Sequence, residues 1–77
     1  MENEIGQNNY RKLIYFFENK IKVHFKDLDE TWYNGLILDL SEIKLTLVIK
    51  EDVRGEIPVL LEDIKPSSIS KFTEVGE

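Results

Sequence analysis

The sequence predicts an all-β protein, a small and strongly bent antiparallel barrel of five strands with an N-terminal helix. Apolar residues first recur at helical spacing and then, from Lys20, at every second position, which marks a change from helix to strand. Turn-forming residues interrupt the second part at intervals of about eight to twelve residues. A glycine, Gly35, lies in the middle of the longest alternating stretch, where it would weaken a flat strand.

The helix is expected from about Asn9 to Glu18. Asn8 or Asn9 can accept a hydrogen bond from the open amides of the first turn, and Asn19 suits the left-handed position that often ends a helix. The core stripe of this helix has helical spacing and consists of Tyr10, Leu13, Ile14, Phe17 and Ile21.

Five short strands are expected after the helix. In the first strand Ile21, Val23 and Phe25 point to one side, and the polar residues between them point to the other. Pro58 lies within the fourth strand, which is therefore expected at a sheet edge or bulge, because proline cannot donate to a ladder. The predicted strands are residues 20–26, 31–40, 44–50, 56–61 and 68–72.

Gly35 is explained if the second strand, TWYNGLILDL, bends there to serve both halves of the sheet. The bend is easiest where no Cβ crowds the concave face. After the bend, Leu36 and Leu38 are expected in a segment that is covered on both faces, and Trp32 before the bend is core if it joins their row. This arrangement leaves Tyr33 beside the solvated face.

Composition limits the classes of partner and compartment. The chain has 77 residues and a net charge of −5, with 15 acidic and 10 basic residues. This balance opposes nonspecific attachment to nucleic acid or to an anionic membrane, and no membrane partner is expected. There is no cysteine, so disulfides and thiolate metal sites are excluded, and a cytoplasmic location is expected. The acidic, polar start is unlike a secretory signal.

One domain is expected over residues 9–72, with a flexible acidic leader at 1–8 and a solvated tail at 73–77. No catalytic signature accompanies this domain. His24, the sole histidine, has no carboxylate or hydroxyl partner at a fixed spacing, and the acidic DLDE and ED clusters lack the layout of a calcium loop. We therefore expect neither an enzyme nor a cofactor or metal.

The stretch NKIKVHFKDLDETWYNGLIL resembles the first motif of the Sm and Sm-like proteins. In that motif a short helix leads into an alternating strand, a turn, and a second strand bent at a glycine. VLLEDIKPSSI is similar in position to the second motif, and the resemblance covers roughly residues 9–72. It implies a noncatalytic interaction module that forms a homo-oligomer and has a role in RNA or ribonucleoprotein handling.

The sequence departs from the family at the positions that usually contact RNA. An Asp and an Asn around the third strand are replaced by Ser41 or Glu42 and then Lys44, and Arg-Gly is replaced by Leu60-Leu61. The strand start DETWYNG is also similar to Tudor-type domains. A protein-binding adaptor of Tudor or SH3-like type is therefore the alternative function, and an acidic decoy of a nucleic-acid-binding protein is a third.

Weak, salt-dependent RNA binding is predicted to use the charges of Lys22 and Lys44 and a stacking face on Tyr33. Tyr33 would also fit a half-buried cross-strand aromatic. Arg11 and Lys12 form a second basic candidate for a phosphate backbone, which the polar face of a helix would also explain.

A protein interface is predicted from two pairs of apolar residues. Tyr15 and Phe16 lie off the core stripe of the helix, where aromatic residues are commoner at interfaces than in free solvent. Ile69 and Phe72 belong to the fifth strand. If the fourth and fifth strands are open edges, we expect them to pair between subunits.

Overall fold

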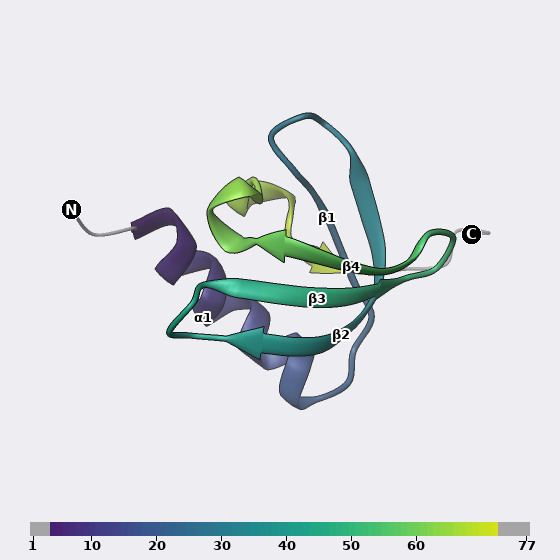
Figure 1. Cartoon of the computed structure of the whole chain (residues 1–77), viewed down its shortest axis with the longest axis horizontal. Helices are drawn as coiled ribbons and strands as arrows, with labels where there is room; N and C mark the ends of the chain where they lie inside the picture. Colours follow the sequence, from purple (N-terminus) through teal and green to yellow (C-terminus); the bar gives the residue numbers. More distant parts are fainter. Residues whose placement is uncertain (1–3, 73–77) are drawn as a thin grey trace.

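The computed structural model describes residues 4–72 as five antiparallel strands and one N-terminal helix, with two 3₁₀ turns before the last strand (Figure 1). The strands pair in the order β4-β3-β2-β1-β5. The predicted antiparallel sheet of five strands with an N-terminal helix is confirmed. The elements are α1 Glu4–Glu18, β1 Val23–Lys26, β2 Trp32–Ser41, β3 Thr46–Glu51, β4 Gly55–Leu60, η1 Leu61–Asp63, η2 Pro66–Ser68 and β5 Ser70–Lys71.

Helix α1 begins at Glu4, so residues 4–8 belong to it and not to a flexible leader. The predicted tail at 73–77 lies outside the described residues. Asn9 is not a cap but a fully buried residue inside the helix. Its Nδ2 donates to the carbonyl oxygens of Leu61 at 2.7 Å and Ile64 at 2.9 Å. The side-chain amide of Asn9 thus links α1 to the end of η1 by two hydrogen bonds.

The C-terminal end of α1 also differs from the expectation. The left-handed residue is Lys20, with φ of 54°, and not Asn19. Asn19 stays in the helical turn, where its backbone amide and its side-chain Nδ2 both donate to the carbonyl of Tyr15, at 3.1 and 2.8 Å. The amide of Ile21 then donates to the carbonyl of Phe16 at 3.0 Å and closes the helix end.

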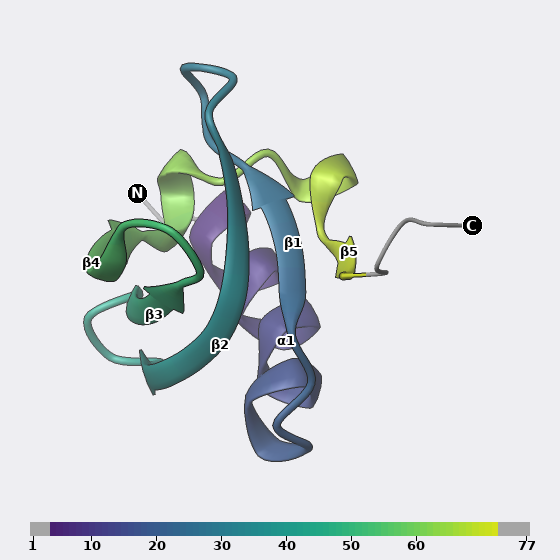
Figure 2. The same ribbon diagram turned by 90° about the vertical axis from the view of Figure 1, so that its right-hand side faces the viewer.

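Strand β2 joins the two halves of the sheet and curves strongly between them (Figure 2). Its first half pairs with β1 and its second half with β3, and Gly35 pairs with both Val23 and Glu51. A Cβ on Gly35 would lie 2.0 Å from the carbonyl oxygen of Lys50. The prediction that the glycine permits a close approach at a bend is confirmed.

The predicted sides of β2 are wrong. Tyr33 is only 9% exposed, whereas Trp32, Leu36 and Leu38 are 44%, 40% and 44% exposed. The register with β1 places Tyr33 opposite the buried Phe25, and their stacked rings have centroids 5.0 Å apart. Alternation alone defines two rows of side chains but does not say which row is covered. The row that contains Tyr33 faces the core, and the other row faces outward.

The core lies between α1 and the sheet, because α1 packs against β2 and η1 (Figure 2). A bulge between Ile37 and Asp39 shifts the β2 register, so that Leu40 packs against the core while Leu38 stays outside. The buried apolar residues are Leu13, Val23, Phe25, Tyr33, Ile37, Leu47, Ile49, Val59, Leu61 and Ile64.

The last three strands follow the prediction with small shifts. β3 begins after Leu45, which has φ of 54° and lies in the preceding turn. Pro58 lies in β4, which is an edge strand as expected. β5 spans only Ser70–Lys71, so it is shorter than the predicted strand at 68–72. Within the described residues no pairing joins β4 to β5, and the sheet is open.

Candidate functional site

Three aromatic rings gather on the outer face of the sheet. His24 of β1 and Trp32 of β2 stack face to face, with ring centroids 4.1 Å apart and planes 4° from parallel. Phe72, which directly follows β5, has its ring centroid 6.2 Å from that of His24. We call these three rings, together with the adjoining Lys22 and Lys26, the aromatic face.

The strand register assembles this face. Lys26 lies opposite Trp32, and His24 lies opposite Asn34 on one side and Ser70 on the other. Side chains of neighbouring strands that point the same way meet directly or diagonally. Nδ1 of His24 donates to Oδ1 of Asn34, and this hydrogen bond helps to fix the imidazole plane against the indole.

The turn at 27–31 sets the β1–β2 register. Oδ1 of Asp27 accepts from the amides of Asp29 at 2.9 Å and Thr31 at 3.0 Å, and Oδ2 accepts from the Tyr33 hydroxyl at 2.9 Å. Burial acts to raise the pKa of Asp27, but the hydrogen bonds from Thr31, Tyr33 and Asp29 outweigh it, so the pKa lies below its ordinary value. The ionised carboxylate therefore organises the turn.

Two lysines lie over the rings of the aromatic face. Nζ of Lys22 is 4.7 Å from the centroid of Phe72, and Nζ of Lys26 is 5.3 Å from the centroid of Trp32. The ring quadrupole attracts an ammonium group in this position. Lys22 also pairs with Asp52 at 2.6 Å. Exposed ion pairs of this kind are weak and are screened by salt.

Lys26 shares a carboxylate with a second lysine. Glu30 pairs with Lys26 at 2.7 Å and also with Lys65. The hydrogen bonds from Lys26 and Lys65 lower the pKa of Glu30 to about 2, so Glu30 is ionised at neutral pH. The same turn also carries Asp27 and Asp29, so the two ammonium groups lie beside three carboxylates.

Comparisons of the chain with protein families, with curated proteins and with solved structures give no match. What the aromatic face can bind therefore has to follow from its own geometry. That geometry consists of stacked rings and flanking ammonium groups.

Tyr33 does not take part in this face, and its burial opposite Phe25 fits the cross-strand aromatic that the sequence also predicts. Its ring is buried against Phe25, its hydroxyl donates to Asp27, and the guanidinium carbon of Arg54 lies 4.6 Å from its centroid. Burial and the hydrogen bond to Asp27 both raise the pKa of the Tyr33 hydroxyl. Trp32, which was expected in the core, occupies the exposed position instead.

The other predicted basic residues are not gathered beside Lys22. Lys44 lies in the turn after the end of β2, whereas Tyr33 lies near its start. Lys12 is on α1 and donates to the carbonyl of Pro66 at 3.2 Å. Arg11, also on α1, donates to Oδ1 of Asn8 at 2.7 Å.

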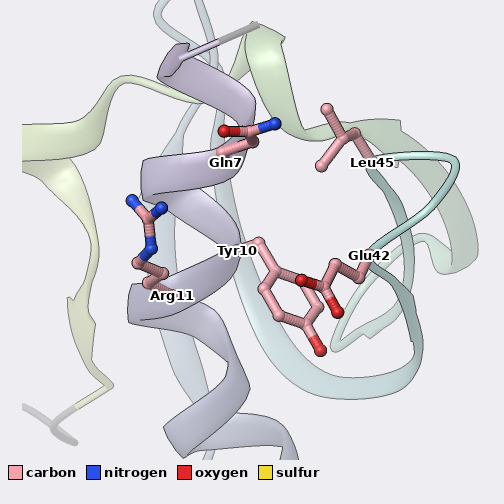
Figure 3. Close-up of a pocket in the computed structure, with 5 residues that line it drawn as sticks. All are labelled: Gln7, Tyr10, Arg11, Glu42 and Leu45. Atoms are coloured by element: carbon pink, nitrogen blue, oxygen red, sulfur yellow. The ribbon is translucent and has the colours of Figure 1, made fainter. Parts of the chain in front are cut away.

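Arg11 borders a small pocket of about 230 Å³ between α1 and the turn after β2 (Figure 3). Tyr10, Glu42, Gln7 and Leu45 complete its lining (Figure 3). This pocket lacks the stacked rings and paired lysines of the aromatic face.

The predicted protein-interface residues separate into two kinds. Tyr15 is 59% exposed, as expected for a residue off the core stripe. Phe16 and Ile69 are partly buried and pack against the core, so less of each side chain is open to a partner. Phe16 lies on α1, which packs on β2 and η1, and Ile69 directly precedes the two-residue strand β5. Phe72 belongs to the aromatic face.

Two further classes of feature are not found in the part of the chain that the structure describes. Residues 4–72 hold no group of three or more His, Cys, Asp or Glu side chains that could bind a metal ion. No helix among them is long and apolar enough to cross a membrane.

Sequence reasoning missed His24 and Trp32 as members of one surface. A signal for them was present, because the turn at 27–31 brings Lys26 opposite Trp32, and His24 alternates with Lys26 on β1. Reading this signal requires the register of the hairpin, which the Asp27 turn fixes through hydrogen bonds to Asp29 and Thr31.

Proposed function

We propose that the protein is a noncatalytic RNA-binding module of the Sm-like kind, in which single-stranded RNA stacks on the aromatic face. The observation that carries the proposal is the parallel stack of His24 on Trp32, whose indole is 44% exposed. Proteins that bind single strands combine an exposed aromatic platform with cations that reach the phosphates. Lys22 and Lys26 stand beside the platform in positions suited to that role.

The charges around the rings favour an anionic ligand over a cationic one. Aromatic cages that bind methylated ammonium groups depend on attraction between the ring face and the cation. Here the ammonium groups of Lys22 and Lys26 already lie over Phe72 and Trp32, and they would repel a second cation. This arrangement supports RNA over the methylated side chains that a Tudor-type adaptor would cover.

The Sm-like assignment is supported by the order and bending of the elements. A helix leads into the alternating strand β1, an acidic turn follows, and β2 bends at Gly35, as in the family that the sequence resembles. β5 returns beside β1. We infer that the bent sheet is a small barrel of that kind, with β4 and β5 at its two edges.

The proposal is tested by titrating the protein with oligouridine at about 50 mM salt. Trp32 is the only tryptophan of the chain, so quenching of its fluorescence reports on stacking at this face. We expect saturable quenching with a roughly micromolar dissociation constant. In anisotropy measurements with labelled RNA, Trp32→Ala should weaken binding by about tenfold, because one stacked base contributes ~1–3 kcal/mol.

Lysine variants provide the matched control for this titration. Lys22→Gln and Lys26→Gln should each weaken RNA binding, whereas Lys44→Gln, in the turn beyond the far end of β2, should not. Binding that is unchanged in Trp32→Ala and Lys26→Gln would show that RNA uses another surface. The absence of binding at low salt would reject the RNA proposal.

We also propose that the protein self-associates through its open sheet edges. The amide of Leu61 donates to the carbonyl of Leu45 at 2.9 Å. Because hydrogen-bonded pairs alternate along an antiparallel ladder, the backbone groups of Glu56, Pro58 and Leu60 point away from β3. Pro58 has no N–H, so this edge donates through Glu56 and Leu60. An added strand would pair with fewer bonds than usual.

A protein-binding adaptor is the second candidate function. It is favoured by the carboxylates that already pair with Lys22 and Lys26, at 2.6 and 2.7 Å, and by the net charge of −5, which opposes approach to a polyanion. The oligouridine titration separates the two functions, because an adaptor of this kind would not quench Trp32 with RNA.

A further inference from the structure

His24 lies at the centre of the aromatic face and is the only histidine of the chain. Its strand, β1, pairs with β2 on one side and with β5 on the other (Figure 2). The imidazole has the indole of Trp32 on its β2 side, at 4.1 Å between centroids, and the ring of Phe72 on its β5 side, at 6.2 Å. His24 is half-buried, so its ring remains in contact with solvent.

One hydrogen bond defines which nitrogen of His24 takes up a proton. Oδ1 of Asn34 can only accept, so Nδ1 carries the hydrogen that it donates there. A neutral imidazole has a hydrogen on one nitrogen only, and Nε2 is then the basic atom. A proton gained in acid therefore goes to Nε2 and leaves the bond to Asn34 in place. The ring changes its charge without turning.

The stack on Trp32 tolerates both charge states of the imidazole. The two ring planes are 4° from parallel, and the face of an indole attracts a cation more strongly than other aromatic side chains do. Protonation of His24 should therefore strengthen the contact with Trp32 and not break it. The stacked platform keeps its shape while its charge rises.

The charged groups around His24 come from β1, from the turn that follows it and from β5. The lysines two residues before and after His24 each pair with a carboxylate. β5 contributes one lysine, opposite the residue before His24, whereas the β2 residues that stack on the imidazole or bond to it are uncharged. These charged groups are Lys22 with Asp52, Lys26 with Glu30, Asp27 and Asp29 in the turn, and Lys71.

Histidine is the one residue type among these groups whose charge changes near neutral pH. It gains or loses its proton between about pH 5 and 8, whereas lysines and ordinary carboxylates keep their charge in that range. Glu30 stays ionised there, because hydrogen bonds from Lys26 and Lys65 hold its pKa at about 2. Mild acid thus adds one positive charge to the aromatic face while the carboxylates beside it stay negative.

We propose that His24 makes RNA binding at the aromatic face depend on pH, because its protonated Nε2–H supplies a third cation for the phosphates. The inference rests on the proposed RNA binding and adds its regulation. Binding is weaker in mild alkali, where Lys22 and Lys26 act alone, and tighter in mild acid. By linkage, bound RNA favours the protonated ring to the same extent.

The test measures the anisotropy of labelled oligouridine with the whole protein at about pH 5.5 and about pH 8, in about 50 mM salt. Uracil and the phosphodiester keep their charge across this range. One added phosphate contact predicts roughly five- to tenfold tighter binding in acid. The slope of log affinity against log salt should change from about −1.4 at the higher pH to about −2.1 at the lower pH.

His24→Phe separates the histidine from the carboxylates. The variant keeps an aromatic ring on β1 but cannot be protonated, so the ratio of its affinities at the two pH values should fall to about one, whatever its affinity in alkali. Lys26→Gln is the matched control, because a lysine keeps its charge in this range. In this variant both affinities should fall, and their ratio should stay like that of the parent.

Proton NMR provides a second measurement that needs no variant. Because the chain has a single histidine, its imidazole signals are assigned without ambiguity, and their dependence on pH gives the midpoint of protonation. Saturation with oligouridine should raise this midpoint by up to about one pH unit, since a tenfold preference of RNA for the protonated form requires such a shift.

The inference is overturned by an affinity that is equal at both pH values, or by an imidazole midpoint that RNA does not move. It is also overturned by a pH dependence that persists in His24→Phe, which would assign the effect to carboxylates. The absence of RNA binding at both pH values would instead reject the proposed function itself. RNA binding that is independent of pH leaves that function standing, so the two failures are distinguishable.

Discussion

The carbonyl oxygen of Lys50 lies 2.0 Å from the position that a β-carbon on Gly35 would occupy. The neighbouring atom is backbone, held in the β2–β3 ladder, so it cannot rotate aside as a side chain would. Residue 35 is also the position at which β2 pairs with β1 and β3 together. Any side chain there must therefore separate two strands of the sheet.

Gly35→Ala should destabilise the protein by more than ~2 kcal/mol, and Gly35→Val by more again, because overpacking against backbone forces the strands apart. The melting temperature measures this loss. Gly55→Asn is the control, since Gly55 has φ of 86° with nothing within 4 Å of its added Cβ, and asparagine tolerates positive φ. A Gly35→Ala melt equal to the parent's would show that β2 does not need the close approach.

Asn9→Ala should cost roughly 1–3 kcal/mol of unfolding free energy, because it leaves the carbonyl of Ile64 without its buried donor and the carbonyl of Leu61 with the amide of Ile64 alone. The urea midpoint measures the change. Asn8→Ala is the matched control, since Asn8 is exposed and its Oδ1 accepts only an exposed bond from Arg11. Equal midpoints for the two variants would contradict the role of Asn9 as the link between α1 and η1.

Glu51 should make the folded state less stable at acidic pH. Burial acts to raise the pKa of Glu51, but hydrogen bonds from the amides of Arg54, Val53 and Asn34 outweigh it, and the folded pKa lies below its ordinary value of 4.5. A group with a lowered folded pKa stabilises the fold above its unfolded pKa and loses that contribution as the pH falls through the folded value. The melting temperature should therefore decline as the pH falls below about 4.5.

Glu51→Gln checks this assignment. The variant should melt lower than the parent at pH 7, and its melting temperature should decline less steeply in acid, because one of the groups that drives the decline is gone. Glu56→Gln removes an exposed carboxylate of β4 and should leave both measurements unchanged. Acid curves of the same steepness for the parent and Glu51→Gln would assign the decline to other groups, with Asp27 as the next to test.

Leu60→Pro should dissociate an oligomer that forms through β4 without unfolding the subunit. Leu60 has φ of −80°, which proline adopts, and its amide points away from β3. Light scattering at micromolar concentration measures the mass, and the melt of the variant confirms folding. Ile69→Asp cannot serve this purpose, because Ile69 packs against the core. A parent that is monomeric in this assay removes the proposed self-association.

The affinity for oligouridine should fall with salt in proportion to the phosphates that the lysines contact. Two contacts, from Lys22 and Lys26, predict a slope of about −1.4 in a plot of log affinity against log salt for a single strand. Lys26→Gln should reduce the slope by about 0.7, whereas Lys44→Gln should not change it. A parent slope near zero would indicate that stacking acts without phosphate contacts.

The sequence by itself determined the order and kind of the elements. The change of period at Lys20 located the helix and the first strand, Gly35 marked the bend, and Pro58 marked an edge strand. These features depend on propensity, spacing and turn chemistry within a few residues. They can be read without knowing what the rest of the chain does.

Only the tertiary structure decided which residues meet. The exposure of Trp32 in place of Tyr33 follows from pairing with β1, and the burial of Asn9 follows from contact with Leu61 and Ile64, far along the chain. An alternating strand has two rows of side chains, and its sequence is compatible with either row facing the core. The choice is made by the free energy of packing against distant segments, which no local pattern contains.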